Sequence, residues 1–399
     1  MKNLFTIRNL FVYVLIIFVS QIQAQTPSKF FEKSFGVNNS VANKELAADT
    51  NGNAYFWGTN SNYYYLGKTN TGGALQWMRQ GVSNSGNLNY SVDFNLSISN
   101  MAVDGGGNIY LAGIAYNPSL GNRLSVVKLN NNGIVQWQAF DTTVSYGQSN
   151  AVVTIDVNGN PVVACERNES CSKVYVVRYN KNNGVTTMAK IHDLIVGQCD
   201  YVRDIKTDSA GNIYVAGYVY VDGTKRNDTY VLKLNNAGNQ QWIKMYDGNS
   251  NNDYAVDLKV DGSGNNIYVA GYGYFAATGN DWLVVKYNAA GTQLWAKNID
   301  GGGNSTDYLD EIIVDNAGFV FACGKQYDPV SGTVYRVFKL NPNNGSSSSK
   351  TLGQCYSTNN TSHIACDATN RIYVSSADYD IQNVTRLSNN LAVQYTWDD

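Results

Sequence analysis

Short apolar runs separated by turn residues recur along the chain at a nearly fixed distance. Residues 208–217 show the unit: an Asp-x-x-Gly turn leads into Ile213-Tyr214-Val215-Ala216, which is apolar on both faces of a strand. The turn aspartate recurs every 52 to 55 residues, at Asp49, Asp104, Asp156, Asp208, Asp261, Asp315 and Asp367. Repeats of about 40 to 50 residues or slightly more are typical of propeller blades. The spacing therefore predicts seven copies of one blade.

Each repeat contains four strand candidates. In the fourth repeat they are Val202–Thr207, Ile213–Ala216, Tyr230–Leu234 and Gln241–Lys244. These runs are rich in β-branched and aromatic residues and are bounded by Gly and Asn, as strands are. A strand that is apolar on both faces needs cover on both, which stacked blades provide. We therefore expect an all-β fold, a seven-bladed β-propeller of four-stranded antiparallel blades.

Two of the four connections in each repeat are short and nearly invariant. Asp-x-x-Gly joins the first and second strands, and Asn-x-x-Gly joins the third and fourth. In the seventh repeat Asn370 replaces the turn glycine, and we expect it to adopt the left-handed conformation that Asn tolerates. In an up-and-down blade the two other connections, which differ between repeats, share the opposite face. We call this the variable face and expect function there, because binding residues concentrate on variable loops of rigid scaffolds.

Composition narrows the classes of function. The chain has 399 residues, a net charge of −2, only 15% charged residues, and 29 tyrosines. Without clustered Lys and Arg, a nucleic-acid-binding surface is not expected. The sequence has no zinc-ligand spacing, G-x-S-x-G motif, phosphate-cradling loop or dinucleotide fingerprint, so we expect no cofactor and no metal. We expect a monomer.

Residues 1–24 are expected to be a signal peptide. Lys2 and Arg8 precede an apolar segment from Leu10 to Val19, and Ala24 is the last residue before the expected cleavage point. That segment has about 10 residues, whereas a membrane-spanning helix needs about 20. The alternative is an uncleaved N-terminal anchor. We expect a secreted or cell-surface protein, or a periplasmic one, without a membrane span in the mature chain.

The remaining chain divides into a short lead, residues 25–43, and the seven-repeat propeller, residues 44–399. Within the lead, residues 29–36 resemble the fourth strand of the later repeats, such as Leu294–Ile299. We expect this strand to pair with the last blade and close the ring, which would remove an exposed sheet edge.

An even number of cysteines, six, in an exported chain indicates disulfides. Cys165, Cys171 and Cys199 belong to the third repeat, and Cys323 and Cys355 to the sixth. All five are expected towards the variable face. We expect the pair Cys165–Cys171, with Cys171–Cys199 as the alternative, and the pair Cys323–Cys355.

Acidic and aromatic residues gather in the variable connections. Asp-Tyr precedes the first strand in three repeats. Further acidic and aromatic residues lie in the connections between the second and third strands. Tyr offers a large amphipathic contact surface, which suits carbohydrate and protein partners. The simpler interpretation is that Asp caps the turn and Tyr packs between blades; a Ca²⁺ site is a further alternative, although no EF-hand-like loop is present. The candidate ligand-binding residues are Asp200, Tyr201, Tyr220, Asp222, Asp253, Tyr254, Tyr274, Asp307 and Tyr308.

A basic residue occupies one position of the third strand in every repeat. It could form an anion-binding ring, or its stem could cover apolar surface in a repeated structural contact. The second interpretation is favoured because a ligand site rarely uses all blades alike. The residues are Lys68, Lys128, Arg178, Lys233, Lys286, Lys339 and Arg386.

The repeat pattern is Asp-x-x-Gly-Asn-Ile-Tyr-Val-x-Gly, then Asp-x-x-Val-Val-Lys-Leu-Asn-x-x-Gly, then Gln-Trp-x-Lys. It resembles the SBBP-type β-propeller repeat of secreted bacterial proteins over roughly residues 44–399. The resemblance implies a seven-bladed propeller on an exported protein. We expect a non-catalytic binding or scaffold module that recognises a glycan, a peptide or a surface protein through the variable face. The alternatives are a propeller enzyme, a glycan lyase or hydrolase using acids of the central funnel, and a mainly structural cell-surface element.

Overall fold

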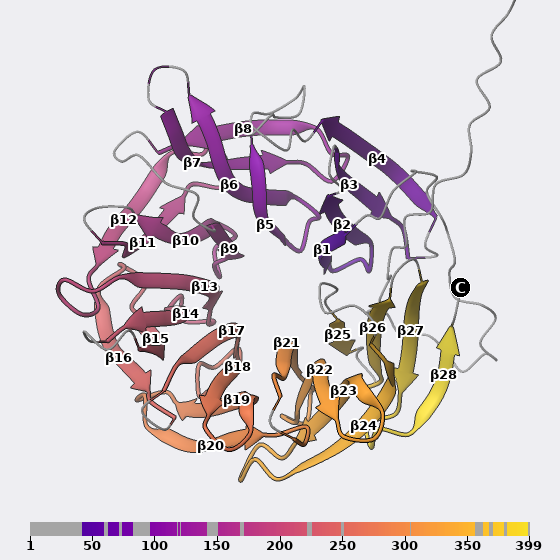
Figure 1. The fold of residues 1–399 in the computed structure, drawn as a ribbon. Helices are drawn as coiled ribbons and strands as arrows, with labels where there is room; N and C mark the ends of the chain where they lie inside the picture. Colours follow the sequence, from indigo (N-terminus) through magenta and orange to yellow (C-terminus); the bar gives the residue numbers. More distant parts are fainter. Residues whose placement is uncertain are drawn as a thin grey trace, which may run out of the picture.

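The described part of the chain folds into seven four-stranded antiparallel sheets arranged in a ring, as Figure 1 shows. The predicted all-β, seven-bladed propeller is confirmed. The computed structural model describes residues 42–59, 63–71, 74–82, 96–117, 119, 121–141, 151–167, 171–221, 226–248, 251–303, 305–355, 362–366, 370–378 and 381–397. The predicted signal peptide, the predicted lead strand at residues 29–36 and the candidate Asp222 lie outside these ranges.

Each blade is built from four strands that are consecutive in sequence. Blade 1 contains β1 (Ala42–Ala48), β2 (Ala54–Thr59), β3 (Tyr63–Thr69) and β4 (Leu75–Val82). Blade 2 contains β5 (Ser97–Val103), β6 (Ile109–Asn117), β7 (Gly121–Leu129) and β8 (Val135–Phe140). Blade 3 contains β9 (Ala151–Ile155), β10 (Pro161–Arg167), β11 (Lys173–Tyr179) and β12 (Thr186–His192).

The other four blades repeat the plan. Blade 4 contains β13 (Asp200–Thr207), β14 (Ile213–Tyr220), β15 (Asn227–Leu234) and β16 (Gln240–Tyr246). Blade 5 contains β17 (Asp253–Val260), β18 (Asn266–Phe275), β19 (Gly279–Asn288) and β20 (Gln293–Ile299). Blade 6 contains β21 (Tyr308–Val314), β22 (Val320–Asp328), β23 (Gly332–Leu340) and β24 (Ser347–Gln354). Blade 7 contains β25 (His363–Cys366), β26 (Ile372–Asp378), β27 (Ile381–Leu387) and β28 (Val393–Trp397).

The first strand of each blade faces the central opening and the fourth lies at the rim (Figure 1). Because neighbouring strands are antiparallel and consecutive, the two invariant turns share one face of the disc and the variable connections share the other. The hydrophobic core lies between blades: Ala164 and Val176 of blade 3 pack in one buried cluster with Val215 and Leu232 of blade 4. No helix within the described residues is long and apolar enough to cross a membrane.

The invariant first turn is held by its aspartate. In blade 4, Asp208 Oδ1 accepts hydrogen bonds from the backbone N–H groups of Ala210 (3.0 Å) and Asn212 (2.9 Å). Its Oδ2 accepts from Asn212 Nδ2 (2.8 Å) and from the Tyr214 hydroxyl (2.9 Å). Gly211 has a φ of 78°, and Asn370, which replaces this glycine in blade 7, has a φ of 59°. The motif is therefore a structural turn, and the expectation for Asn370 is confirmed.

The repeated basic residue and the repeated tryptophan join neighbouring blades. Lys233 Nζ and Trp242 Nε1 of blade 4 both donate to Ala289 O in the β19–β20 turn of blade 5, at 3.2 and 3.1 Å. Lys233 also lies over the Tyr214 ring, 5.2 Å from its centroid. Lys68 with Trp77, Lys128 with Trp137, and Lys286 with Trp295 make the same contact. These residues form a structural contact, which favours that interpretation over an anion-binding ring.

Candidate functional site

The central channel contains a cavity of about 560 Å³. It is lined by the first strands of blades 1, 2, 4, 5, 6 and 7. Ten of its eighteen lining residues are charged or polar, because the inner strands carry polar residues on the side that faces the axis. The polar and charged lining residues are Glu45, Asn100, Arg203, Asp204, Lys206, Asp257, Lys259, Asp310, Glu311 and His363.

In five blades, a β-bulge in the inner strand brings one polar residue to the same level of the channel. The bulge lies just before Glu45, Asn100, Asp204, Asp257 and Glu311, each four residues ahead of a turn aspartate. A bulge leaves backbone groups without their partner in the sheet. In most blades the polar residue of one blade accepts the hydrogen bond from a backbone N–H of the next.

Five such bonds run around the channel. They are Met101 N to Glu45 Oε2 (2.6 Å), Val153 N to Asn100 Oδ1 (2.7 Å), Leu258 N to Asp204 Oδ2 (3.1 Å), Ile312 N to Asp257 Oδ2 (2.9 Å) and Ile364 N to Glu311 Oε2 (3.1 Å). Blade 3 has Val152 at this position, and Ile205 N bonds instead to Asp204 of its own blade (2.7 Å). The channel carboxylates therefore join blades.

Lysines neutralise two of these carboxylates. Lys206 Nζ lies 2.5 Å from Asp204 Oδ1, and Lys259 Nζ lies 3.0 Å from Asp257 Oδ1. Burial raises the pKa of Asp204. For Asp257, the charges of Lys259 and Lys206 together with hydrogen bonds outweigh burial and lower the pKa. Burial raises the pKa of Glu45 to about 7. Glu45 is therefore the channel carboxyl that changes protonation near neutral pH.

An arc of five tyrosines lies where the channel meets the variable face. Tyr201 and Tyr218 are paired across β13 and β14, and Tyr254 and Tyr272 across β17 and β18. Within the pairs the ring centroids are 4.7 and 5.2 Å apart. Between blades, Tyr218 lies 4.9 Å from Tyr254, and Tyr272 lies 5.8 Å from Tyr308. We call these five residues the tyrosine arc; it crosses blades 4, 5 and 6 without interruption.

Arg203 connects the arc to the cavity. Its Nη2 donates to the Tyr218 hydroxyl (2.9 Å), and its guanidinium lies 5.0 Å from the Tyr218 ring centroid. Arg203 also lines the cavity. The arc therefore borders the opening of the cavity, and one fixed positive charge lies at that border.

Among the residues that the structure describes, the arc occupies only one side of the ring. At the position of the Tyr201–Tyr218 pair, blade 1 has Ala42 and Thr59, and blade 2 has Ser97 and Ile114. In blade 6, Lys325 stands opposite Tyr308 and forms a buried ion pair with Asp310 at 3.6 Å. If these tyrosines served only to pack blades together, they would be expected in every blade. Their restriction to three blades favours a role in binding.

The structure brings together three of the candidate tyrosines, Tyr201, Tyr254 and Tyr308, and 40% of the Tyr308 side chain is exposed. Tyr220 is half-buried at the end of β14, and Tyr274 is exposed at the end of β18, in the connections of the same face. The arc thus includes one predicted tyrosine from each of three blades.

The candidate aspartates lie behind the arc, in buried positions. Asp200 Oδ2 accepts from Leu194 N (3.0 Å), and Asp253 Oδ2 accepts from Gly248 N (2.6 Å). Asp307 accepts from Gly301 N and Tyr327 N, both at 2.7 Å. Burial raises the pKa of Asp200 and Asp253 to about 7 and that of Asp307 to about 6. These side chains hold the loops that enter the inner strands, which agrees with the simpler interpretation of Asp as a cap.

Sequence reasoning missed Tyr218, Tyr272 and Arg203. The sequence did contain a signal for the two tyrosines. Gly217-Tyr218 and Gly271-Tyr272 occupy the same position, at the end of the second strand, in consecutive repeats. Their contact with the predicted tyrosines depends on the strand register, which pairs Tyr218 with Tyr201 and Tyr272 with Tyr254. Arg203 is the bulge residue of β13, and nothing in the sequence marks a bulge there.

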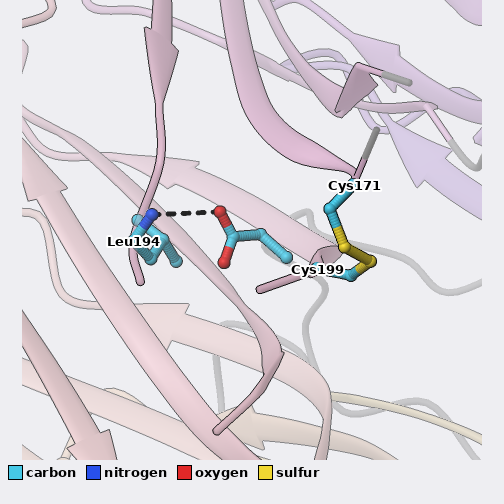
Figure 2. Close-up of a disulfide and its surroundings, with 4 residues drawn as sticks. Cys171, Leu194 and Cys199 are labelled. Atoms are coloured by element: carbon cyan, nitrogen blue, oxygen red, sulfur yellow. Dashed lines mark hydrogen bonds between the residues drawn. A yellow bond between two sulfur atoms is a disulfide. The ribbon is translucent and has the colours of Figure 1, made fainter. Parts of the chain in front are cut away.

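One disulfide, Cys171–Cys199, is present among the described residues. It joins the start of β11 to the loop before β13, with the Cα atoms 4.8 Å apart. Figure 2 shows it together with Leu194, whose backbone N–H donates to the carboxylate of Asp200, the residue after Cys199. The favoured pair Cys165–Cys171 was wrong, and the alternative is correct. Cys165 points into the core between blades 2 and 3, where a bond to Cys171 would remove it from its packing.

The predicted pair Cys323–Cys355 is also not formed, and both residues remain thiols. Cys323 packs in the core between blades 6 and 7. Its thiol contacts the Ser362 hydroxyl, 3.4 Å away. Strand alternation therefore points Cys323 into the core, although its position along the strand is close to the variable face.

No family model and no curated protein matches the chain. Solved structures resemble it in fold. A quinohemoprotein alcohol dehydrogenase from Comamonas testosteroni has 12% identity and a TM-score of 0.53, over 90% of this chain and 68% of that one. An ulvan lyase of polysaccharide lyase family PL25 has 14% identity and a TM-score of 0.52, over 86% and 92%. Prolyl oligopeptidase B from Galerina marginata has 9% identity and a TM-score of 0.51, over 90% and 51%. These likenesses show the fold alone.

Proposed function

We propose that the chain is an exported, non-catalytic binding propeller that holds a glycan on the tyrosine arc. The observation that carries the proposal is the restriction of the arc to blades 4, 5 and 6, next to the cavity opening. Tyrosine rings offer flat apolar faces for sugar rings and hydroxyls for hydrogen bonds. Arg203 adds a positive charge, which favours a sugar that carries a carboxylate or sulfate.

Export is supported by the sequence of residues 1–24 and by the resemblance to SBBP-type repeats of secreted bacterial proteins. The Cys171–Cys199 disulfide fits an oxidising compartment. A peptide or a surface protein would use the same arc, since tyrosine also suits protein contacts. The glycan is favoured because the cavity beside the arc is lined by both charged and apolar residues, which suits the mixed surface of a sugar.

The second candidate is a glycan lyase or hydrolase. Glu45 supports it, because a carboxyl with a pKa of about 7 inside a cavity could act as a general acid or base. Two observations weigh against it. Glu45 already accepts hydrogen bonds from Met101 N and Asn100 Nδ2. On the variable face, each close group of three aspartates has one exposed member, Asp247 or Asp300, and two buried ones. A glycosidase needs two carboxyls that both reach the substrate.

The experiment is a glycan and peptide array probed with the purified protein and with two variants. Tyr308→Ala removes the most exposed ring of the arc, and Val157→Ala alters an exposed residue of the first-turn face. We expect binding to acidic glycans that Tyr308→Ala weakens and Val157→Ala leaves unchanged. Equal binding by both variants would contradict the proposal. Release of unsaturated or reducing sugar from a bound glycan, lost in Glu45→Gln, would favour the enzyme instead.

A further inference from the structure

A group of acidic residues lies at the junction of blades 5 and 6, next to Tyr308 of the tyrosine arc. Asp281 of β19, Asp300 after β20 and Asp307 before β21 each place a carboxylate oxygen within 4.8 Å of the others. Asp281 and Asp307 are buried, whereas Asp300 is exposed. We call these three residues the blade 5/6 acid cluster. Its exposed member gives solvent ions access to two buried carboxylates.

The hydrogen bonds of this cluster leave its charge uncompensated. Asp281 Oδ2 accepts from Thr278 Oγ1 (2.7 Å) and Asn298 Nδ2 (2.8 Å). Asp300 and Asp307 accept from the backbone N–H groups of Gly302 and Gly301. All these donors are neutral, and no Lys, Arg or His of the described residues forms an ion pair with the three carboxylates.

One oxygen of the cluster is buried without a partner. Asp281 is 1% exposed, and its Oδ1 has no hydrogen-bond partner among the described residues. A buried carboxylate oxygen without a partner is costly unless a cation or a proton satisfies it. Asp281 is therefore the residue at which a ligand is most needed.

The equivalent junction of blades 3 and 4 shows what the position requires. There Asp193 and Asp200 correspond to Asp300 and Asp307, but Lys173 stands in place of Asp281, five residues before the repeated basic residue of the third strand. The Lys173 ammonium lies 3.4 Å from Asp193 Oδ2. At this junction the chain supplies its own cation.

The junction of blades 4 and 5 contains three aspartates and also a basic side chain. Asp228, Asp247 and Asp253 again lie within 4.8 Å of one another. Here Arg226 lies between two of them, with Nε 3.5 Å from Asp228 Oδ1 and Nη2 3.5 Å from Asp247 Oδ2. Two of the three junctions therefore contain a basic side chain, and the blade 5/6 acid cluster does not.

We propose that the blade 5/6 acid cluster binds one Ca²⁺ ion, held by Asp281, Asp300 and Asp307. Ca²⁺ binds oxygens at about 2.3–2.6 Å, so opposite ligands can lie up to about 5 Å apart, whereas Mg²⁺ at about 2.0–2.1 Å limits them to about 4.2 Å. Three carboxylate oxygens that all lie within 4.8 Å of one another can be shared by one Ca²⁺ ion. Water would complete the six to eight oxygens that the ion takes. The sequence suggested a Ca²⁺ site on this face only as an alternative, because no EF-hand-like loop is present.

The Ca²⁺ ion fastens the loop between β20 and β21 to β19. It joins blades 5 and 6 directly below the part of the chain that carries Tyr308, the residue after Asp307. The proposal does not depend on the identity of the ligand at the tyrosine arc.

The test is a calorimetric titration of the EDTA-treated, dialysed protein with CaCl₂, together with thermal melts in EDTA and in about 5 mM CaCl₂. Extracellular Ca²⁺ modules have a Kd of about 10⁻⁴–10⁻³ M, and we expect a value in this range, with weaker binding of MgCl₂. Asp281→Lys copies the arrangement of Lys173. We expect this variant to fold, to bind Ca²⁺ at least about tenfold more weakly, and to melt at the same temperature with and without CaCl₂.

The matched control is Asp193→Asn, which changes the corresponding exposed carboxylate at the junction where Lys173 is present. It should leave the Ca²⁺ titration unchanged. Wild-type protein that shows neither heat of binding nor a shift in melting temperature with CaCl₂ would overturn the proposal. An equal Ca²⁺ response in wild type and Asp281→Lys would also overturn it, because the ion would then bind elsewhere.

Discussion

At the scale of single residues, aspartate has three roles in this molecule. Asp208 and its equivalents hold the invariant first turn with up to four hydrogen bonds. Asp204 and Asp257 accept from the backbone of the next blade. Asp253 lies buried behind the tyrosine arc. The sequence predicts the first role, because the turn motif is local, but not the second, because it depends on a bulge and a neighbouring blade.

The buried aspartates make stability depend on pH. Burial, opposed by the Gly248 N–H and by Arg226 and reinforced by Asp228 and Asp247, raises the pKa of Asp253 from 3.8 to about 7. A carboxyl whose pKa is higher in the folded state contributes stability below its unfolded pKa and loses that contribution as the pH rises through the folded value. Asp253 therefore favours folding at pH 4 and progressively less up to about pH 7.

Asp253→Asn should remove this dependence, because the amide is neutral and its oxygen can still accept from Gly248 N. We expect the free energy of unfolding of the variant, relative to wild type, to rise between about pH 4 and pH 8 by a few kcal/mol at most. Urea unfolding in EDTA at several pH values measures it. A difference between variant and wild type that stays constant over this range would contradict the assignment.

At the scale of elements, the contacts between blades are as regular as the strands. Trp242 donates to Ala289 O and lies against Gly291, whose φ of 76° and missing side chain make room for the ring. Blade 3 has Met188 in place of Trp, and it packs against Gly238 in the same way. The glycine of the Asn-x-x-Gly turn is thus required both by the backbone conformation of the turn and by the side chain that packs on it from the neighbouring blade.

Trp242→Ala should therefore destabilise the protein at the junction of blades 4 and 5. A half-buried tryptophan that also donates a hydrogen bond is worth about 2–4 kcal/mol. The matched control is Leu294→Ala on β20, where half of the side chain is exposed and the cost should be about 0.5 kcal/mol or less. Urea unfolding measures both, and equal effects would refute the role of the tryptophan contact.

The Cys171–Cys199 disulfide joins residues 28 positions apart and closes a segment that contains β11 and β12. Loop closure on this scale contributes about 2–4 kcal/mol, largely by restricting the unfolded chain. A Cys171→Ser, Cys199→Ser double variant should therefore melt lower than wild type. Dithiothreitol should lower the melting temperature of wild type and leave the double variant unchanged. A similar response of both proteins to dithiothreitol would point to another disulfide.

At the scale of the whole molecule, the repeat predicts the ring but not the site. Seven turn aspartates at a regular spacing are enough for seven blades, since each repeat specifies its own four strands. The position of the variable face follows from the same topology. The tyrosine arc does not follow, because Tyr218 meets Tyr254 only when two blades lie side by side at the angle that the ring imposes. The favoured pairing Cys165–Cys171 was wrong for a related reason: strand alternation turns Cys165 inward.

Titration calorimetry measures whether the tyrosine arc binds the ligand. The ligand used is the glycan that binds most tightly on the array. Wild type is compared with Tyr272→Ala, which removes a ring from the middle of the arc, and with Tyr272→Phe, which keeps it. A lost aromatic contact costs about 0.5–1.5 kcal/mol, so we expect the Kd of Tyr272→Ala to rise about two- to tenfold and that of Tyr272→Phe to stay near wild type. A folded Tyr272→Ala variant with unchanged Kd would show that the glycan does not bind on the tyrosine arc.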